Sequence, residues 1–524
     1  MSHSTAADPA LKRGLNSLVA PAEALDTAVD GAIGSAAFVP VGTSSEVKLC
    51  RTASELTHTL QQQVGVSAGL AALPVPLLGY RRVFQESLHT TVFSVSLVVK
   101  AQRVLEGLEV QEPQLRFDPS TLDTPEALDH FVRRHGDSWV RGVQLGGEVL
   151  GVYTLYAQTR EESEALVHTI GLSLPIQGVS VTPELANTLR KLTRESSVNT
   201  TFQVKVVGTQ QQPALATPDD LIAYVTHFSA QPLEDPVVLQ IDTRGYEDLP
   251  GMWNVFQPVV ANRKVFTGRN GLMRKRQRLA ELANQCRWVD KTLRLYGQTL
   301  EPSLANTSAE IQAAIKAIDT LAESFRTSAS TPLEVASLPN LSFQSPRLAP
   351  TLLTPLHLGG DAGRGDAFPF NDRAKAIQRR RRLAKVILNS GRLIDQIRLT
   401  YVQDPDVNSI GPQPQEWTEG HGIPKGKDSL PLQLDLANGE RITTIHANTG
   451  TGVDQLEFIT NLQQQIGGGR PSTGGLPSSW TAGPQQVLLG FQGRAKSWLD
   501  SLEPVVADFS HALRWEPVNE NEDP

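Results

Sequence analysis

Cysteine and long apolar runs are scarce in this sequence. Only Cys50 and Cys286 occur among 524 residues, which excludes a disulfide framework. We expect two buried free thiols, although a single bridge between them stays open. No stretch approaches the roughly 18–20 unbroken apolar residues of a membrane helix, and residues 1–21 lack the basic start and apolar core of a secretory signal. We therefore expect a protein that is soluble as synthesised, cytoplasmic or released without a signal peptide.

The sequence also has fewer basic than acidic residues, with 48 Lys and Arg against 55 Asp and Glu. The formal net charge of -7 and the pI of about 5.9 argue against a nucleic-acid partner, because such proteins are usually basic. The histidines lack the spacing of metal ligands, and no phosphate loop or dinucleotide fingerprint is present. We expect no metal, no cofactor and no enzymatic activity. The length allows two to four domains.

The residue pattern changes along the chain and predicts an α+β protein with an all-β C-terminal part. Six segments follow from these changes: a loosely ordered leader over 1–35, a mixed strand-and-helix domain over 36–255, a helical extension over 256–327, a linker rich in Ser and Pro over 328–355, a module of Gly-rich turns and short strands over 356–515, and a tail over 516–524.

Within residues 36–255, strands and helices are expected to alternate. A helix is predicted over Thr124–Arg134, because Thr124 is a plausible cap and Pro125 suits the first turn. Period-2 patterns predict half-buried strands, and helical patterns lie between them. The strands are Phe93–Val99, Glu148–Gln158, Thr169–Gln177, Thr201–Val207 and Val237–Ile241, and the helices are Arg160–Val167 and Pro183–Arg194.

A compact motif follows the first of these helices. It consists of His135-Gly136-Asp137-Ser138-Trp139, six further residues, and Gly146-Gly147. It resembles the membrane-attack-complex/perforin (MACPF) group, whose members carry an aromatic-Gly-Thr-His-aromatic run and a glycine pair at this spacing. His135 departs from the first aromatic position, and Asp137-Ser138 depart from Thr-His.

The resemblance covers about residues 40–255 and implies a bent antiparallel sheet flanked by two helical clusters. In the family these clusters unfurl into amphipathic β-hairpins that join a barrel of several subunits. Two alternating segments would supply the hairpins here, although periodicity alone favours strands of a soluble sheet. Gly146-Gly147 would act as a hinge, with a structural bulge as the alternative. The hairpin residues are Val64, Val66, Leu70, Ile170, Leu172, Leu174 and Ile176.

Three stretches of the C-terminal module share a strand-turn-Asp-strand pattern. The pattern resembles the jacalin-type lectins, whose fold is a β-prism of three four-stranded sheets. That resemblance implies sugar binding by Gly-x-x-x-Asp turns and by an upstream glycine-rich loop. In the last turn Lys496 replaces glycine, which we expect to strain the turn or crowd the pocket. The alternative is that the aspartates only stabilise turns. The implied sugar residues are Gly359, Gly360, Gly391, Asp395, Gly450, Asp454, Trp498 and Asp500.

Together these features predict a pore-forming or membrane-interacting protein. Its partners would be membrane lipids, a possible glycan and further copies of itself on the membrane. The alternative is a non-lytic carbohydrate-binding or adhesion protein that keeps the MACPF fold. Glu161, Glu162 and Glu164 lie near the second hairpin segment and favour this alternative, because charge at lipid-facing positions is costly.

Overall fold

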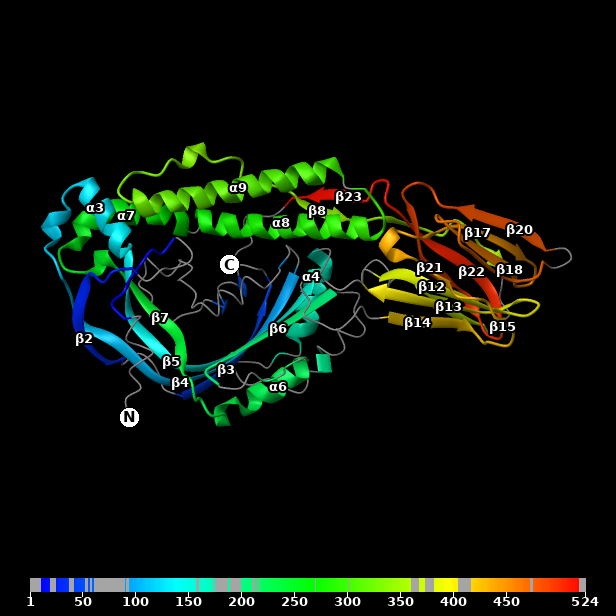
Figure 1. The fold of residues 1–524 in the computed structure, drawn as a ribbon, viewed down its shortest axis with the longest axis horizontal. Helices are drawn as coiled ribbons and strands as arrows, with labels where there is room; N and C mark the ends of the chain where they lie inside the picture. Colours follow the sequence, from blue (N-terminus) through cyan, green and yellow to red (C-terminus); the bar gives the residue numbers. More distant parts are fainter. Residues whose placement is uncertain are drawn as a thin grey trace.

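The computed structural model describes most of the chain. Within the described residues the molecule is elongated, with a curved sheet and long helices at one end and three smaller sheets at the other (Figure 1). None of the described helices is long and apolar enough to cross a membrane. The described residues are 11–18, 25–36, 42–51, 55–56, 59–60, 90, 94–156, 160–172, 174, 187–188, 199–209, 213, 215, 217–268, 270–299, 301–359, 367–372, 381–403, 416–471 and 475–517.

Two long antiparallel strands form the centre of the N-terminal sheet. They are β4 (Ser94–Leu115) and β5 (Ser138–Tyr156). Over one half of this pair, β3 (Gly42–Cys50) runs beside β4 and β6 (Asn199–Val207) runs beside β5. Strands therefore occur at four of the five predicted segments, those that begin at Phe93, Glu148, Thr201 and Val237, but β4 and β5 extend well beyond the alternating segments that predicted them.

The other half of the sheet contains residues that we expected to be a loose leader. There β2 (Val29–Ser35) pairs with β4, β7 (Val237–Gly245) pairs with β5, and β1 (Gly14–Leu15) pairs with the start of β5. Leu15 and Val29 are buried, so the leader prediction is wrong for the described part of residues 1–35. These short strands are stabilised by pairing with distant strands, which no local pattern reveals.

The glycine pair Gly146-Gly147 lies where the two halves of the sheet meet. β5 pairs with β7 as far as Gly146 and with β6 from Glu148 onward, and the register against β4 shifts at this point. A Cβ atom on Gly146 would come 2.0 Å from the carbonyl oxygen of Arg103, and one on Gly147 would come 2.4 Å from the side chain of Leu233. Close packing against the backbone therefore requires glycine at position 146, whereas a side chain at position 147 would first have to displace the end of Leu233. Hinge motion stays a prediction.

Helices flank this sheet on several sides. α3 begins as predicted, because the Thr124 hydroxyl accepts a hydrogen bond from the Ala127 amide and Pro125 occupies the first turn. The described helices are α3 (Pro125–His135), α4 (Arg160–Gly171), α6 (Pro218–His227), α7 (Met252–Thr267), α8 (Leu272–Leu295) and α9 (Pro302–Thr327), with short 3-10 turns η1 (Pro119–Leu122), η2 (Phe228–Ala230), η3 (Tyr246–Asp248), η4 (Val335–Ser337) and η5 (Leu436–Asn438).

Helix α4 includes residues that we predicted to form a strand. Ile170 lies in its last turn and is fully buried, whereas Leu172 follows the helix and is 76% exposed. Leu166 and Ile170 share one helix face and join a core cluster with Val95 and Leu97 of β4. This packing favours the helix, so the strand prediction is wrong where the segment is described. Leu174 packs at the edge of the same cluster.

Several predicted features fall outside the described residues. They are the hairpin residues Val64, Val66, Leu70 and Ile176, the glycine Gly360, and all but two residues of the predicted helix Pro183–Arg194.

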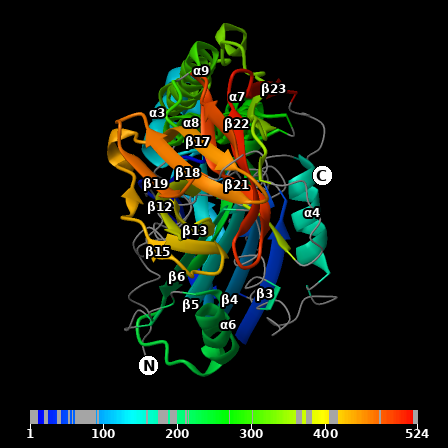
Figure 2. The same ribbon diagram turned by 90° about the vertical axis from the view of Figure 1, so that its right-hand side faces the viewer.

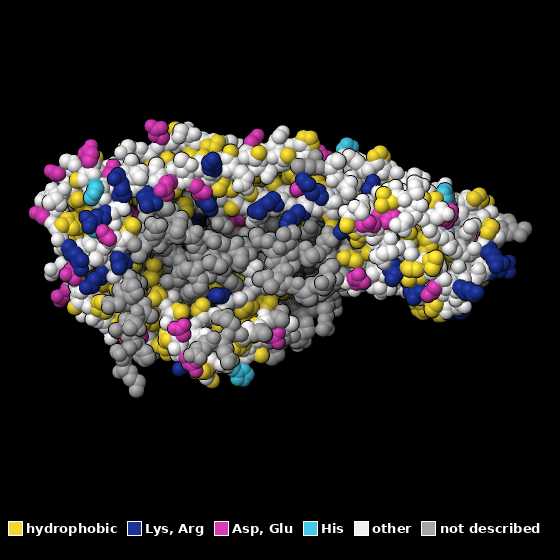
Figure 3. Space-filling model, viewed as in Figure 1, with side chains coloured by type: hydrophobic (Ala, Val, Ile, Leu, Met, Phe, Trp, Pro, Cys, Tyr) yellow, Lys and Arg dark blue, Asp and Glu magenta, His cyan; other side chains and the backbone are white. Residues whose placement is uncertain are grey.

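The long helices share one core with the sheet and are not a separate extension. Val143 of β5 and Ile241 of β7 belong to the same cluster as Val259, Leu282 and Ile318 of the three long helices. On the face seen in Figure 3, basic and acidic side chains are interspersed along this layer.

Both cysteines are free and buried, as predicted. Burial raises the pKa of each thiol to about 11, so neither is a reactive thiolate at neutral pH.

The C-terminal part consists of three sheets in its described residues, and they lie in front of the N-terminal sheet in Figure 2. The first repeat forms the sheet β14-β13-β12 with β15 and β16, the second forms β19-β18-β17-β20, and the third forms β10-β22-β21-β11 with β9. Their strands are β9 (Thr351–Leu353), β10 (Leu358–Gly359), β11 (Phe368–Asn371), β12 (Arg381–Ser390), β13 (Ile394–Gln403), β14 (Glu416–Gly422), β15 (Lys427–Asp428), β16 (Leu432–Gln433), β17 (Ile442–Thr449), β18 (Val453–Thr460), β19 (Gln465–Gly469), β20 (Leu476–Thr481), β21 (Gln486–Ala495) and β22 (Leu499–Asp508).

The predicted linker, residues 328–355, pairs with strands near the C-terminus and with the sheet of the third repeat. Its β8 (Ser345–Leu348) pairs with β23 (Leu513–Glu516), and its β9 joins the sheet of the third repeat. At the junction the ring of Tyr296, after α8, packs 5.5 Å from the ring of Phe509. Residues 328–355 therefore connect the two parts through sheet pairing, which their irregular composition did not predict.

Candidate functional site

Three hairpin turns of the C-terminal part have the same backbone arrangement. They join β12 to β13, β17 to β18 and β21 to β22, and in each the strand register shifts just before the turn. The amides of Gly391, Gly450 and Lys496 donate equivalent hydrogen bonds across the turns, at 3.1, 3.1 and 3.2 Å. The sequence spacing Gly-x-x-x-Asp thus corresponds to one repeated turn.

Lys496 does not strain the third turn. In the part of the chain that the structure describes, the only non-glycine residues with positive φ are Lys12, Glu112 and Gln463. Lys496 therefore has an ordinary backbone conformation and keeps the hydrogen bond of the other turns. The expectation of backbone strain at this position is wrong, and crowding by the lysine side chain is the remaining difference between the sites.

A glycine on the neighbouring strand packs against each repeat aspartate. Gly422, Gly469 and Gly359 have φ values of +99°, +80° and +103°, and each is paired with the residue that follows an aspartate. A Cβ atom at these positions would come within 2.0–2.2 Å of the carbonyl oxygens of Asp395, Asp454 and Asp500, respectively. Only glycine fits such positions.

Of these glycines, only Gly359 was identified from the sequence, as part of the glycine-rich loop. Gly422 and Gly469 were missed. Their signal was present in the runs Gly420-His421-Gly422 and Gly467-Gly468-Gly469.

The three aspartates differ in their access to solvent. Asp454 is 2% exposed, whereas Asp395 and Asp500 are half-buried. In the first repeat, a Cβ atom on Gly391 would lie 3.5 Å from Oδ2 of Asp395, so glycine leaves that carboxylate open from the side of the turn. Lys496 occupies the equivalent place beside Asp500. Asp395 and Asp500 are therefore the two accessible carboxylates, and only Asp395 has a glycine at the turn position beside it.

Asn389 fixes the loop that borders the first-repeat turn. Its Oδ1 accepts hydrogen bonds from the amides of Lys425 and Gly426, at 3.0 and 2.9 Å. Its Nδ2 donates to the carbonyl of Gly426 and to Oδ1 of Asp428. Asn389 is 4% exposed, so the loop is held by a buried side chain with both its amide groups satisfied.

The second and third turns contact each other. A Cβ atom on Gly452 would lie 3.5 Å from Cδ1 of the half-buried Trp498 and 3.0 Å from the carbonyl oxygen of Leu499. The two turns therefore lie at the same end of the domain, and Trp498 contributes to their packing.

The His135–Trp139 motif forms a buried contact, here called the joint, between the sheet, residues 11–18 and helix α7. Asp137 is fully buried and accepts hydrogen bonds from the amide and hydroxyl of Ser17 and from Arg263, which also pairs with Glu247. Trp139 is 1% exposed. The motif thus holds residues 11–18 and helix α7 on the sheet.

The other motif residues contact the same N-terminal segment. Gly136 has φ +78°, and a Cβ atom there would lie 2.0 Å from the carbonyl oxygen of Leu15. The Ser138 hydroxyl donates to this carbonyl at 3.2 Å. His135 contacts the carbonyl of Asp26 through Nδ1 at 2.9 Å, and burial lowers the pKa of its imidazole.

Residues 358–504 match the family model of the jacalin-like lectin domain, which confirms the predicted C-terminal fold and places a lectin-like domain in this chain. The match does not reach residues 36–255, so the MACPF resemblance of that region stays a prediction. No curated protein matches the chain.

Three similar solved structures are lectins, and each covers less than a third of this chain. Wild-type Malaysian banana lectin is 20% identical, with 30% of this chain and 99% of that chain covered and a TM-score of 0.23. A mannose-binding jacalin-related lectin from Ananas comosus is 22% identical, with 30% and 99% covered and a TM-score of 0.22. Artocarpin in complex with mannotriose is 16% identical, with 30% and 97% covered and a TM-score of 0.24. These scores are too low to bear on function.

Proposed function

We propose that this chain is a carbohydrate-binding protein without enzymatic activity, and that the first-repeat turn is its principal sugar site. The observation that carries the proposal is the half-buried Asp395 carboxylate, which glycine leaves open at position 391. A carboxylate accepts strong hydrogen bonds from sugar hydroxyls. The buried Asn389 holds the adjacent loop in place, so the site is ordered before a ligand arrives.

Binding of mannose and mannotriose to the full chain tests this proposal, since these sugars are named for the lectins above. We expect Asp395→Asn to weaken binding about tenfold or more, because a hydrogen bond to a charged group contributes about 1.5–3 kcal/mol. Asp500→Asn is the matched control, since it changes the same turn position in the third repeat. Equal loss in both variants would contradict the first repeat as principal site. Absence of binding to a panel of glycans would contradict the function itself.

We also propose, as a second function, that the N-terminal sheet inserts β-hairpins into a membrane after activation, as copies assemble. One observation favours it. The pairing of β3 with β4 stops at Cys50 and Ser96, where β3 ends and β4 is near its start. The pairing of β5 with β6 stops at Tyr156 and Asn199, where β5 ends and β6 begins. Because Ser94 pairs with Tyr156, both connections, residues 51–93 and 157–198, leave from the same end of adjacent strand pairs.

Refolding of these connections as antiparallel hairpins would lengthen the existing strands without any change of register. A membrane-spanning strand needs only about 9–11 residues, which both connections can supply twice. Closed barrels satisfy every backbone group in lipid. Helix α4 would have to leave the sheet first, because Ile170 is buried against it.

Dye release from lipid vesicles with and without surface glycans tests this second function. Vesicles that remain intact at every composition would count against it. A disulfide that joins α4 to β4, in a chain with Cys50→Ser and Cys286→Ser, should block release until it is reduced. Ile170 is the suitable place for the tether on α4, since Leu172 points away from the core at 76% exposure. Release unaffected by the oxidised tether would contradict movement of α4.

A further inference from the structure

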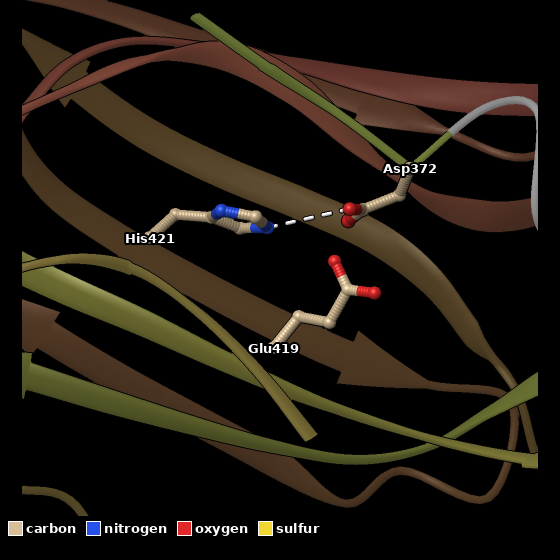
Figure 4. A group of neighbouring side chains, drawn as sticks. All are labelled: Asp372, Glu419 and His421. Atoms are coloured by element: carbon tan, nitrogen blue, oxygen red, sulfur yellow. Dashed lines mark ion pairs between the residues drawn. The ribbon is translucent and has the colours of Figure 1, made fainter. Parts of the chain in front are cut away.

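Two carboxylates and an imidazole meet between the first and third repeats. Asp372 directly follows the edge strand β11, and Glu419 and His421 lie two residues apart on the edge strand β14. Residues two apart on a strand point to the same face. Their ligand atoms all lie within 4.8 Å of one another, and Figure 4 shows the three side chains directed toward a common point.

Asp372 is held in a fixed orientation. It is 4% exposed, and its amide donates to the carbonyl of Phe491 at 3.0 Å. The Tyr401 hydroxyl donates to its Oδ2 at 2.9 Å, which leaves Oδ1 directed at His421. A carboxylate oriented by a second residue in this way is the usual arrangement around bound metals.

His421 is held equally firmly but lacks a hydrogen bond at its inner nitrogen. Its ring stacks on Phe370, with centroids 3.8 Å apart and planes 9° apart. Its side chain is 11% exposed, and Nε2 is buried with no hydrogen-bond partner among the described residues, although Oδ1 of Asp372 is 3.3 Å away. A simple His–Asp ion pair would align an N–H with the carboxylate. The observed orientation leaves a buried nitrogen unsatisfied, which is costly.

A metal ion satisfies these groups together. Adjacent ligand atoms about 2.0–2.2 Å from one ion are separated by about 2.8–3.6 Å in octahedral or tetrahedral geometry, and the His421–Asp372 distance of 3.3 Å falls in this range. Glu419 is half-buried, and one of its carboxylate oxygens lies within 4.8 Å of the ligand atoms of Asp372 and His421, so it is the third ligand of the group. Imidazole with carboxylates suits first-row divalent metals, whereas calcium and magnesium prefer oxygen alone.

We propose that Asp372, Glu419 and His421 form a binding site for a first-row divalent metal ion, with zinc as the first candidate. The ion joins β11 of the third-repeat sheet to β14 of the first-repeat sheet. It therefore stabilises the closed domain. Gly422, which packs on Asp395, is the next residue after His421, so the ion also holds the end of β14 against the first-repeat turn. The metal site itself does not depend on carbohydrate binding.

Titration of the chelator-treated full chain with zinc chloride, followed by calorimetry and thermal unfolding, tests the site. We expect one zinc ion per chain and a higher melting temperature with zinc. His421→Gln and Glu419→Gln should each weaken zinc binding about tenfold or more. His511→Gln, at an exposed histidine of the same domain, is the matched control and should bind zinc as the original chain does.

Cobalt in place of zinc separates this site from the two thiols. We expect visible absorption typical of nitrogen and oxygen ligands, without the intense near-ultraviolet band of a thiolate. Undiminished zinc affinity in both the His421→Gln and Glu419→Gln variants would overturn the proposal, as would absence of stoichiometric binding to the original chain. Thermal unfolding of each variant without metal shows whether the variant is folded. If His421→Gln does not fold, the zinc affinity of Glu419→Gln still tests the site. Loss of metal binding with sugar binding intact leaves the carbohydrate proposal unaffected.

Discussion

Gly422 packs directly on the backbone of Asp395. A Cβ atom on Gly422 would lie 2.1 Å from the carbonyl oxygen of Asp395, so there is no space for a side chain. The same relationship joins Gly359 to Asp500 and Gly469 to Asp454. The three repeats therefore share a contact between neighbouring strands as well as a turn. This contact places a glycine-bearing strand end beside each aspartate.

Substitution of Gly422 by alanine should damage the first-repeat turn. The positive φ and the clash together should cost about 2 kcal/mol or more in free energy of unfolding. Gly439→Ala is the control, because Gly439 also has a positive φ of +70° but a Cβ atom there would have no other atom within 4 Å; we expect a cost of about 1 kcal/mol there. Urea unfolding measures both. Equal costs would show that the contact with Asp395 is not tight.

Loss of the Asn389 side chain should loosen the loop beside the same turn. Asn389→Ala removes the acceptor of the Lys425 and Gly426 amides. Both residues are exposed, so water can replace the lost acceptor in part, and we expect a cost of about 0.5–1.5 kcal/mol and weaker sugar binding. Hydrogen exchange at these two amides, together with urea unfolding, measures the effect. Asn340→Ala removes an exposed asparagine that bonds only locally to Ser342 and should change little. Unaltered exchange in Asn389→Ala would contradict the role assigned to this side chain.

Asp242 should make the stability of the N-terminal sheet depend on pH. Within the described part of the chain its carboxylate oxygens are buried without hydrogen-bond partners, and Arg141 and Arg244 lie 3.7 and 4.0 Å away. Burial outweighs these two charges and raises the pKa of Asp242 from 3.8 to about 6. The folded state therefore holds the proton more tightly than the unfolded state. Stability from this residue is complete below pH 3.8 and is lost as the pH rises through 6, by about 3 kcal/mol in all.

Asp242→Asn tests this pH dependence. We expect the variant to be more stable than the original chain at pH 7.5 and equally stable near pH 3.5, because Arg141 keeps its ion pair with Glu109 at 3.2 Å. Chemical unfolding across this pH range measures the difference, with the exposed Asp123→Asn as control. A constant difference between variant and original chain at all pH values would exclude titration of Asp242 as the cause.

Removal of Arg263 should destabilise the joint formed by the His135–Trp139 motif. Arg263→Met leaves Asp137 and Glu247 buried without their partner, and breaking such a buried pair costs about 3–5 kcal/mol. Arg276→Met is the control, since Arg276 pairs with Asp319 at the surface of α8 and α9, where an ion pair contributes at most about 1 kcal/mol. Thermal unfolding compares the two variants. Similar losses would show that burial of the motif network has little energetic effect.

Local patterns in the sequence predicted the C-terminal domain well. Period-2 alternation and the repeated Gly-x-x-x-Asp spacing indicated its strands and turns, because a hairpin is set by residues that are close in the chain. The resemblance of this pattern to the jacalin-type lectins agrees with the family model that matches residues 358–504. The same reasoning failed at Ile170, where alternation predicted a strand and packing of Leu166 and Ile170 against the sheet gives a helix. It also failed for β1 and β2, whose stability comes from strands about a hundred residues away.

Composition and local spacing were enough to establish that this chain has few cysteines, lacks a long unbroken apolar run, and carries a threefold strand-turn-Asp-strand repeat in its C-terminal part. The resemblance of that repeat to the jacalin-type lectins is supported by the family model over residues 358–504. Only the folded chain reveals which aspartates are accessible, since Asp395 and Asp500 are half-buried and Asp454 is buried. Folding also brought Asp372 to Glu419 and His421 across two sheets. Such sites depend on contacts between residues far apart in the chain, and their separation in the sequence leaves no periodic signal that could predict them.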